Sequence, residues 1–458
     1  MASKTEAIYY ASPVWLQNLL VSLMGYRLYR KRYTAPYLDL LAQVRESRCW
    51  NRQQRDDYQS EQLHRLIRHC STQIPYYQQL FAEHGFHHNQ FTSLPDLRKL
   101  PILDKQTLRA RPEAFRSNSG RPYMMQNTSG STGTPLTLAV NEQTYKTAMA
   151  LLVDHEEHHG VPFRSRRATF AGRMVQRAND TKPPFARTNL AENQRLYSSY
   201  HLNRYTFPYY REDLDRFAPL ELIGYPSAIC DLASHYLATG TRPCFQTKAI
   251  VTNSETLLEW QRQRIEQVFG CQVRDYYGTA EYVVFAGQDQ QGIYRTSPVL
   301  GITEVIAEGS TDGEGELIAT SLTNDAMPLL RYRIGDSATP ALGNDAGDVV
   351  RVDALARING RIDDYIHTAD GRRIGRIDHI FKGVTGVREA QVIQDQPDHC
   401  IVKVVVDESI NTFDEGVLIG NLLYRTGNSM RVSVEKTSQI ERGPNGKFKA
   451  VISLVKPV

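Results

Sequence analysis

Eight consecutive residues, Thr128–Pro135, combine five hydroxyl groups and two glycines without any charge. Glycine lets backbone N–H groups approach a phosphate closely, and the hydroxyls add small donors, so the segment suits the phosphates of a nucleotide. The candidate contacts are Thr128, Ser129, Gly130, Ser131, Thr132, Gly133 and Thr134. A Walker loop would continue with Lys after the last glycine, and this segment does not, so the fixed cation must come from elsewhere. Taken alone, the segment also fits a flexible Ser/Gly linker.

Four further segments follow this loop in a fixed order: Asp275–Glu281, Arg331–Asp336, Gly360–Ile366 and Gly443–Lys449. From about Pro101 onwards, the order and rough spacing of the five segments resemble the adenylate-forming superfamily of acyl-CoA synthetases and related ligases. One position departs from that pattern. Relatives often carry a hydroxyl directly before the motif glutamate, whereas Ala280 stands there in this chain and the hydroxyl belongs to Thr279.

A narrower resemblance is to phenylacetate-CoA-ligase-like proteins of the CapK type, which are often associated with polysaccharide biosynthesis. The segments that carry it are Gln17–Leu20, Pro75–Tyr77, Leu196–Leu202 and Gly224–Ser227. Some relatives of phenylacetate ligase carry a cysteine-rich metal site, and no such cluster stands in this sequence.

The pattern of the chain indicates a mixed α/β protein. Short apolar runs, Ala249–Val251 and Leu317–Thr320, alternate with helical stretches such as Glu255–Phe269. The resemblance implies a large N-terminal adenylate-forming domain over 1–359, with a helical lead-in over about 1–100. It also implies a small mobile α+β C-terminal domain over 360–458 that carries the catalytic lysine. In that last part, we expect strands over 389–392, 400–406 and 432–435 and a helix over about 411–426.

The resemblance also implies roles for particular residues. Activation of a carboxylate requires ATP to be held in line with it while charge on the phosphates is neutralised. Tyr277 would stack on adenine with Gly278 beside it, and Thr279 would reach the α-phosphate. Glu281 would hold Mg²⁺, a hard cation that prefers oxygen ligands. Asp336 would accept hydrogen bonds from the ribose hydroxyls.

The C-terminal segments supply the remaining roles. Lys447 would be the missing cation that bridges carboxylate and α-phosphate, although Lys449 stands only two residues away. Arg361 would contact the ribose, and Asp363 would be the hinge between the two half-reactions. Each candidate also has an ordinary interpretation: a core aromatic for Tyr277, a solvated helix residue for Glu281, a turn carboxylate for Asp336, and a solvated lysine beside a turn for Lys447.

The resemblance would place His201 and Tyr225 in the acyl pocket, since they fall roughly where the family lines it. His201 would orient the carboxylate, or it would be a hydrogen-bonded structural histidine. Asn253–Glu255 stands where relatives carry a small adenine loop. A helical run around His155 contains three histidines and two glutamates, which suit either a metal or a solvated charged face.

Composition narrows the class of protein. The 458 residues are 41% hydrophobic and 23% charged, with a net charge of +4, which is ordinary for an enzyme and makes nucleic acid an unexpected partner. Six scattered cysteines form no Cys-x-x-Cys pair, so a reducing cytoplasm is the simplest location. No secretory signal is recognisable at the start of the sequence.

An apolar stretch near the start is followed by basic residues. Val14–Met24 is interrupted by polar residues and is too short to span a bilayer, which takes roughly 20 apolar residues. Over residues 14–32, two interpretations stay open: a helix packed on the protein's own core, or a basic amphipathic helix on a membrane surface.

The sequence therefore predicts an ATP- and Mg²⁺-dependent ligase that converts a small carboxylic acid to an acyl-adenylate and pyrophosphate. The acyl group would then pass to the thiol of CoA or to an amine. The alternative is a catalytically inactive, nucleotide-binding scaffold in polysaccharide biosynthesis. A nucleotidyltransferase is more remote and would release a sugar-nucleotide.

Overall fold

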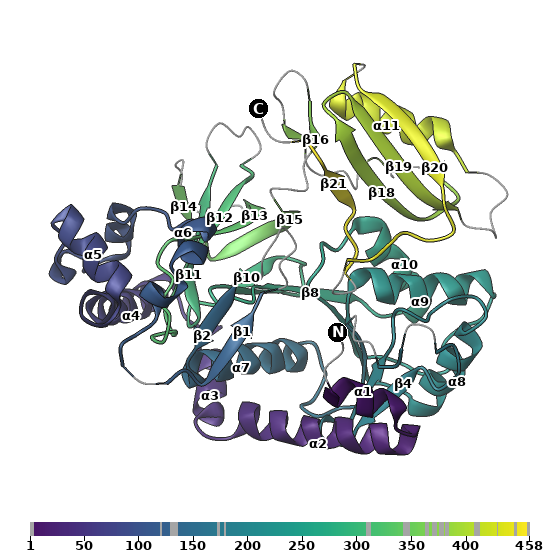
Figure 1. Ribbon diagram of the computed structural model, residues 1–458, viewed down its shortest axis with the longest axis horizontal. Helices are drawn as coiled ribbons and strands as arrows, with labels where there is room; N and C mark the ends of the chain where they lie inside the picture. Colours follow the sequence, from purple (N-terminus) through teal and green to yellow (C-terminus); the bar gives the residue numbers. More distant parts are fainter. Residues whose placement is uncertain are drawn as a thin grey trace. The chain divides into compact units, whose positions relative to one another are not determined.

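The fold was analysed in a computed structural model (Figure 1). It describes residues 4–119, 121–128, 136–171, 175–177, 180–307, 313–341, 349–361, 366–368, 373–374, 380, 384–406, 413–427, 429–443 and 447–455. The chain forms two compact units. Unit 1 comprises Met1–Gly25, Arg164–Val273 and Asn359–Val458, and unit 2 comprises Tyr26–Phe163 and Arg274–Ile358. One unit boundary thus falls at Asn359, and the division into domains 1–359 and 360–458 stays a prediction.

Unit 2 is built on antiparallel strands. In sheet order they are β14 (Val349–Arg351), β11 (Gly301–Ile306), β12 (Gly315–Ser321), β13 (Tyr332–Pro340), β15 (Ala354–Arg361), β10 (Tyr294–Thr296), β9 (Phe285–Gln288) and β8 (Val273–Gly278). A separate hairpin pairs β1 (Met124–Asn127) with β2 (Thr137–Val140). The predicted apolar run Leu317–Thr320 lies in β12, where Leu317 and Ile318 are buried.

Helices of unit 2 cover this sheet. They are α3 (Tyr37–Ser47), α4 (Arg52–Gln73), α5 (Pro75–His84), α6 (Lys105–Ala110) and α7 (Glu142–His158), with short 3₁₀ turns at His88–Gln90, Leu94–Lys99 and Pro112–Phe115. Asn51 caps α4 through the backbone N–H of Gln54. Pro75 starts α5, and Gly85, at φ 64°, follows its end. Leu66 and Ile67 of α4 enter the core cluster that also contains Leu317.

Helix α7 buries polar residues. His155 and Glu156 are 6% and 1% exposed, so the expected solvated charged face is wrong for these two positions. A Cβ at residue 287 would stand 2.5 Å from His155 Nδ1, so glycine is needed there. Among the described residues, no group of three or more His, Cys, Asp or Glu side chains is arranged to hold a metal. Burial lowers the pKa of His155 to about 3.

This histidine predicts a pH dependence of stability. The pKa of His155 is about 6.5 in the unfolded chain and about 3 in the folded protein. Between these values only the unfolded chain binds the proton, so the free energy of unfolding falls as the pH drops from about 6.5 towards 3. The loss should reach on the order of 2 kcal/mol at pH 5. Urea denaturation at pH 7 and pH 5 should show this loss in the wild type and a smaller one in His155→Gln. The exposed His84→Gln provides the control. Equal pH dependence in all three proteins would contradict a buried neutral His155.

Unit 1 contains a mainly parallel sheet in the order β7 (Ala249–Thr252), β6 (Glu221–Gly224), β3 (Arg167–Phe170), β5 (Gln194–Tyr197) and β4 (Ala186–Asn189). Only β4 runs antiparallel to its neighbour among these pairs. The helices around it are α8 (Phe207–Phe217), α9 (Pro226–Ala238) and α10 (Glu259–Phe269), and a 3₁₀ turn covers Leu190–Glu192. Leu222 and Ile250 are fully buried, as parallel strands covered by helices require. The predicted strand at 249–251 is β7, and the helix expected over 255–269 begins at Glu259.

The last part of the chain forms a four-stranded sheet in the order β20 (Arg431–Lys436), β19 (His399–Val406), β18 (Val387–Gln396) and β21 (Val451–Ser453). The two-residue strands Ile366–His367 and Arg373–Ile374 pair separately. Helix α11 (Glu415–Thr426) buries Leu418 and Leu422 against Val392 and Val402 (Figure 1). Each of the three predicted strands and the predicted helix corresponds to one of these elements.

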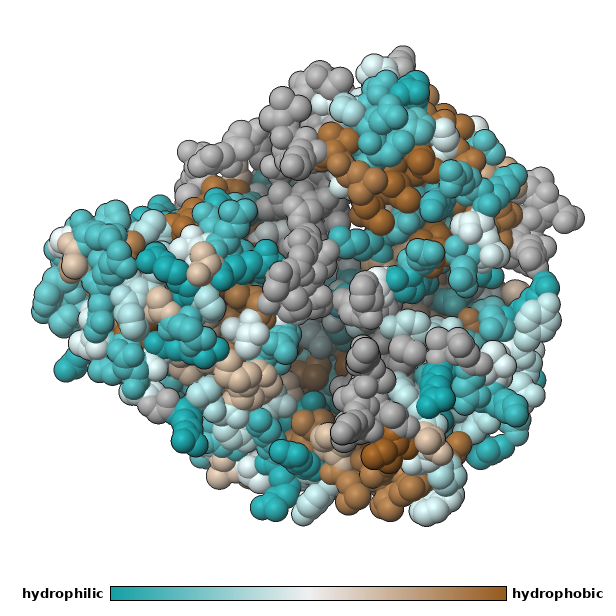
Figure 2. Space-filling model, viewed as in Figure 1, coloured by the Kyte–Doolittle hydropathy of each residue, from teal (hydrophilic) through white to brown (hydrophobic). Residues whose placement is uncertain are grey.

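The chain begins with α1 (Lys4–Ala11) and α2 (Val14–Tyr33). Along the lower edge of Figure 2, the surface over α2 includes a brown patch beside paler and teal atoms. Among the described residues, no helix is both long and apolar enough to cross a membrane.

Candidate active site

The two central motif segments of unit 2 meet through one hydrogen bond. Tyr277, near the end of β8, donates its hydroxyl hydrogen to Asp336 Oδ2 at 2.5 Å. Asp336 lies in β13 directly after Gly335, whose φ of 84° turns the strand. The bond holds the phenol ring and the carboxylate in fixed orientations, as stacking on adenine and binding of ribose would both require.

Glu281 is buried in the turn that follows β8. It is 7% exposed, and its Oε1 accepts hydrogen bonds from Tyr332 Oη at 3.1 Å and Lys105 Nζ at 3.3 Å. The ordinary interpretation of Glu281 as a solvated helix residue is therefore wrong. Lys105 was not among the candidates, and it stands 176 residues away in the sequence. An ammonium group already compensates the charge of this carboxylate.

Thr279 carries a polar atom that needs a partner. Its Oγ1 is buried and accepts or donates no hydrogen bond within the described part of the chain. Such an unsatisfied buried group costs about 1–3 kcal/mol, and a ligand oxygen would recover that cost. At Gly278, an added Cβ would meet only ordinary contacts of 3.8 Å or more, so the protein's own packing does not demand glycine.

The predicted phosphate loop lies between β1 and β2. Thr128 is 8% exposed, its N–H donates to Leu136 O at 2.9 Å, and its Oγ1 accepts from Leu136 N at 3.0 Å. These bonds close the base of the hairpin. Ser129, Gly130, Ser131, Thr132, Gly133 and Thr134 lie outside the described residues.

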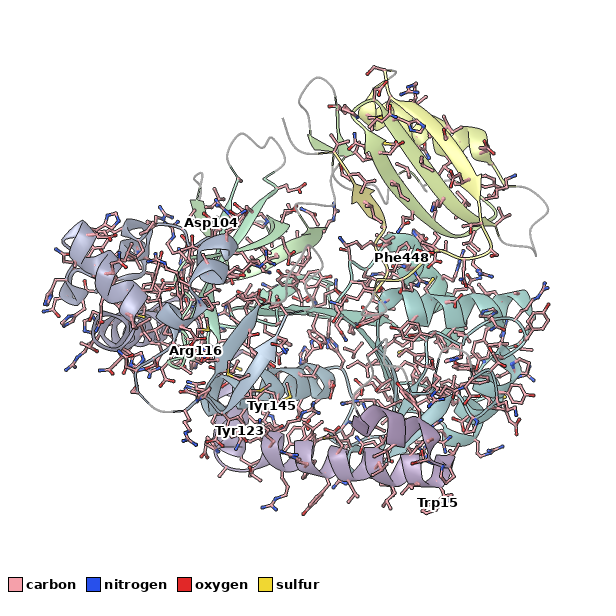
Figure 3. All side chains as sticks on the ribbon, in the orientation of Figure 1. Trp15, Asp104, Arg116, Tyr123, Tyr145 and Phe448 are labelled. Atoms are coloured by element: carbon pink, nitrogen blue, oxygen red, sulfur yellow. The ribbon has the colours of Figure 1, made fainter. Side chains whose placement is uncertain are left out.

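In unit 1, one carboxylate joins three of the candidate segments. Glu255 Oε1 accepts a hydrogen bond from the backbone N–H of Phe448 at 2.6 Å, and its Oε2 accepts one from Ser227 N at 3.1 Å. Phe448 directly follows Lys447, whose carbonyl accepts from Gly443 N at 2.9 Å. Figure 3 shows Phe448 beside α9 and α10. Burial raises the pKa of Glu255, and the two N–H groups oppose that rise.

Further polar contacts dock the C-terminal residues on the same unit. Arg264 of α10 donates to the carbonyls of Val387 and Arg388, both at 3.2 Å. Arg442 forms an ion pair with Glu389 at 2.5 Å, and its guanidinium lies 4.9 Å from the centre of the Phe448 ring. Lys447 is half-buried within this arrangement.

The predicted nucleotide-contact and hinge positions after β15 are only partly described. Arg361 ends β15, but its side chain and the whole of Asp363 lie outside the described residues. The neighbouring Gly360 has φ 98°, and a Cβ there would stand 2.8 Å from Thr256 Oγ1. Glycine is therefore required beside the predicted hinge.

His201 is held at both ring nitrogens. Its Nδ1 lies 2.7 Å from Ser198 Oγ and its Nε2 lies 3.0 Å from the Arg177 carbonyl, and the residue is 5% exposed. A carbonyl only accepts, so the hydrogen is assigned to Nε2, and Nδ1 accepts from the Ser198 hydroxyl. These contacts favour the structural interpretation of His201. Tyr225 precedes α9, is 8% exposed and packs in the apolar cluster of unit 1. Its role in the acyl pocket stays a prediction.

Comparison with known proteins shows what this chain resembles. A family model of the CapK C-terminal domain matches residues 366–454. Protein CapK from Staphylococcus aureus is 27% identical over 456 residues, which cover 98% of this chain and 99% of that protein. The chain is therefore similar to CapK over nearly its whole length. Phenylacetate-coenzyme A ligase from Pseudomonas putida is 26% identical over 421 residues, covering 86% of the CapK-like chain and 85% of that ligase.

Solved structures agree on the fold. A 2-hydroxyisobutyryl-CoA ligase in its postadenylation state superposes with a TM-score of 0.65 at 18% identity, over 88% of this chain and 90% of that one. The same ligase with an acyl-AMP and CoA in the thioesterification state gives a TM-score of 0.52 at 18% identity, over 88% and 90%. The predicted family resemblance, the α/β adenylate-forming fold and the ligase class are confirmed.

The contact between Glu255 and the Lys447 segment predicts a local change on mutation. A hydrogen bond to a charged acceptor is worth about 1.5–3 kcal/mol, so Glu255→Ala should speed hydrogen exchange of the Phe448 amide by roughly tenfold or more. Glu255→Gln keeps an acceptor oxygen and should give a smaller increase. Exchange would be followed by mass spectrometry on peptides covering 440–455.

Glu259→Ala is the matched control, because Glu259 is exposed one turn further along. Exchange that is unchanged in Glu255→Ala, or equally accelerated in Glu259→Ala, would contradict the assignment.

Proposed function

We propose that the CapK-like chain activates a carboxylic acid with ATP to form an acyl-adenylate, and then transfers the acyl group to the thiol of CoA. The observation that carries the proposal is the hydrogen bond between Tyr277 and Asp336, because these residues are 59 positions apart and belong to two different motif segments. The paired Glu281 and the docked Lys447 segment support it.

The first half-reaction is a displacement at phosphorus. An oxygen of the acid attacks the α-phosphorus of ATP, the bond to the β-phosphate oxygen breaks, and pyrophosphate leaves. Lys447 would neutralise charge between the carboxylate and the α-phosphate, and the buried hydroxyl of Thr279 would donate to a phosphate oxygen. Asp336 would accept from the ribose, with Tyr277 and Gly278 along the adenine.

Magnesium fits the residues at Glu281. A carboxylate is the type of ligand that Mg²⁺ prefers, and the ion would supply charge neutralisation on the phosphates. Lys105 Nζ, 3.3 Å from Glu281 Oε1, pairs with this carboxylate and orients it.

The second half-reaction transfers the acyl group. A thiolate attacks the acyl carbon, the bond to the phosphate oxygen of AMP breaks, and a thioester and AMP result. CoA is the proposed acceptor because the phenylacetate-coenzyme A ligases and the 2-hydroxyisobutyryl-CoA ligase are named for it. ATP as the co-substrate and six free cysteines favour the cytoplasm. An amine acceptor, and an inactive scaffold in polysaccharide biosynthesis, are the outcomes that the next experiment separates.

The proposal predicts ATP–pyrophosphate exchange that depends on one class of acid. A panel of aryl, fatty, amino and sugar acids should give exchange with one class, and Lys447→Ala should slow it by about 10²- to 10³-fold, because the cation acts on charge in the transition state. ATP affinity should stay nearly unchanged. Lys449→Ala, two residues further along, is the control and should retain most exchange.

With the active acid, product analysis after addition of CoA or an amine identifies the acceptor. ATP binding without exchange for any acid would favour the scaffold. Normal exchange in Lys447→Ala would contradict the assignment of Lys447 as the cation that neutralises charge in the transition state.

For Asp336, the proposal predicts that substitution changes the affinity for ATP and not primarily the rate of adenylation. Asp336→Ala should weaken ATP binding by about 1.5–3 kcal/mol, measured by calorimetry, because hydrogen bonds to a charged acceptor are lost. Tyr277→Phe keeps the ring but loses the bond to Asp336 Oδ2, so its effect should be smaller. Asp57→Ala, at an exposed position on α4, should leave affinity unchanged. Full affinity in Asp336→Ala would place the ribose elsewhere.

A further inference from the structure

The part of helix α2 that belongs to unit 1 contacts the rest of that unit through polar side chains. Gln17 Oε1 accepts from Arg187 Nε at 2.5 Å, and Asn18 Oδ1 accepts from Thr188 N at 3.0 Å. Ser22 Oγ donates to Thr188 O at 3.2 Å and accepts from Leu190 N at 3.1 Å. The inner side of this helix therefore contacts β4 and the residue after it by hydrogen bonding.

Near these hydrogen bonds, the backbone of α2 also comes close to the side chain of Asn189. A Cβ added at Gly25 would stand 2.0 Å from Asn189 Oδ1, so only glycine fits against that side chain. Gln17 and Gly25 are the buried residues of α2. One side of α2 therefore packs on the protein itself, through polar contacts.

The outer side of α2 is apolar and exposed. Its large hydrophobic side chains and their exposed fractions are Trp15 68%, Leu19 49%, Leu20 37%, Leu23 57%, Met24 56% and Tyr26 56%. We call these six residues the α2 apolar face. Their spacing at three, four and seven positions places them along one side of a helix. Figure 3 shows Trp15 pointing outward from α2, and Figure 2 shows brown atoms over the same helix.

Basic side chains continue this face. Arg27 follows Leu23 by four residues and Arg30 follows Tyr26 by four, so both project from the same side, and both residues are exposed. A shallow depression at this end is lined by Tyr26, Arg27, Arg30, Lys31 and Thr34. Lys31 is partly engaged there, since its Nζ donates to Tyr123 O at 3.2 Å. Helix α2 contains no acidic residue over its 20 positions.

The charge and the aromatic residues favour one occupant. Two copies of α2 side by side would bring basic groups together without acidic partners, whereas anionic lipid headgroups complement Arg27 and Arg30. Trp15 and Tyr26 have amphipathic rings that prefer the boundary between headgroups and acyl chains. Each large apolar side chain removed from water contributes about 1.5–3 kcal/mol as an upper bound, so six supply a substantial attraction.

We propose that α2 lies flat on an anionic membrane surface, with the α2 apolar face inserted among the lipids and Arg27 and Arg30 at the headgroups. The helix is held on the protein by its polar inner side, so it needs no refolding to bind. This attachment is independent of the proposed ligase reaction.

The test is sedimentation with lipid vesicles. The wild type should bind phosphatidylcholine vesicles containing about 30% phosphatidylglycerol more tightly than pure phosphatidylcholine vesicles, and added salt should weaken binding. The double variant Trp15→Ser/Leu23→Ser should lose binding to both. Arg27→Glu/Arg30→Glu should lose at least tenfold for the anionic vesicles only. Leu38→Ser, at a 73% exposed apolar position on α3, is the matched control and should bind as the wild type does.

All substituted side chains are exposed, and circular dichroism would verify that each variant is folded. Binding by the Trp15→Ser/Leu23→Ser variant equal to that of the wild type would overturn the proposal, as would no preference for anionic vesicles. A wild-type dimer in analytical ultracentrifugation that dissociates in that variant, without vesicle binding, would assign the face to a second copy and also overturn it.

Discussion

The Glu255 carboxylate is the constraint on which the arrangement of unit 1 depends most. It accepts one hydrogen bond from the backbone N–H of Ser227, at the start of α9, and another from the backbone N–H of Phe448, next to Lys447. Each of its two oxygens therefore fixes a different segment. Removal from water raises the pKa of this carboxyl, and the two N–H donors are what make an ionised group tolerable there. A group in this position couples the placement of Lys447 to the start of α9, which directly follows the acyl-pocket candidate Tyr225.

In unit 2, hydrogen-bond donors also orient two acidic side chains. Asp336 accepts a hydrogen bond from the Tyr277 hydroxyl, and Glu281 accepts hydrogen bonds from the Tyr332 hydroxyl and the Lys105 ammonium. Each acidic group is therefore oriented by the protein before any ligand arrives, and this lowers the cost of ordering it on binding. The unsatisfied hydroxyl of Thr279 stands in the same segment. Tyr277 and Glu281, which are ordered by partners, thus stand two residues before and after a hydroxyl that has no partner in the described part of the chain.

Local patterns predicted much of the fold. Apolar runs located β7, β12 and the strands at 400–406 and 432–435, because burial of alternate or continuous side chains is written into adjacent residues. Lys105 and the link between Glu255 and Phe448 were not predicted, since these partners are 176 and 193 residues apart. The buried His155 and the polar inner side of α2 were also missed. In both cases, composition gave the polarity of the residues, but only the tertiary packing determines which side faces the protein.

The measurement that tests acid activation most directly follows one oxygen atom. The acid that supports pyrophosphate exchange would be labelled with ¹⁸O in its carboxylate, and the nucleotide product would be examined by mass spectrometry after transfer to the acceptor. Attack by the carboxylate on the α-phosphorus predicts that AMP carries one ¹⁸O from the acid. Unlabelled AMP, or labelled inorganic phosphate together with ADP, would contradict an acyl-adenylate intermediate.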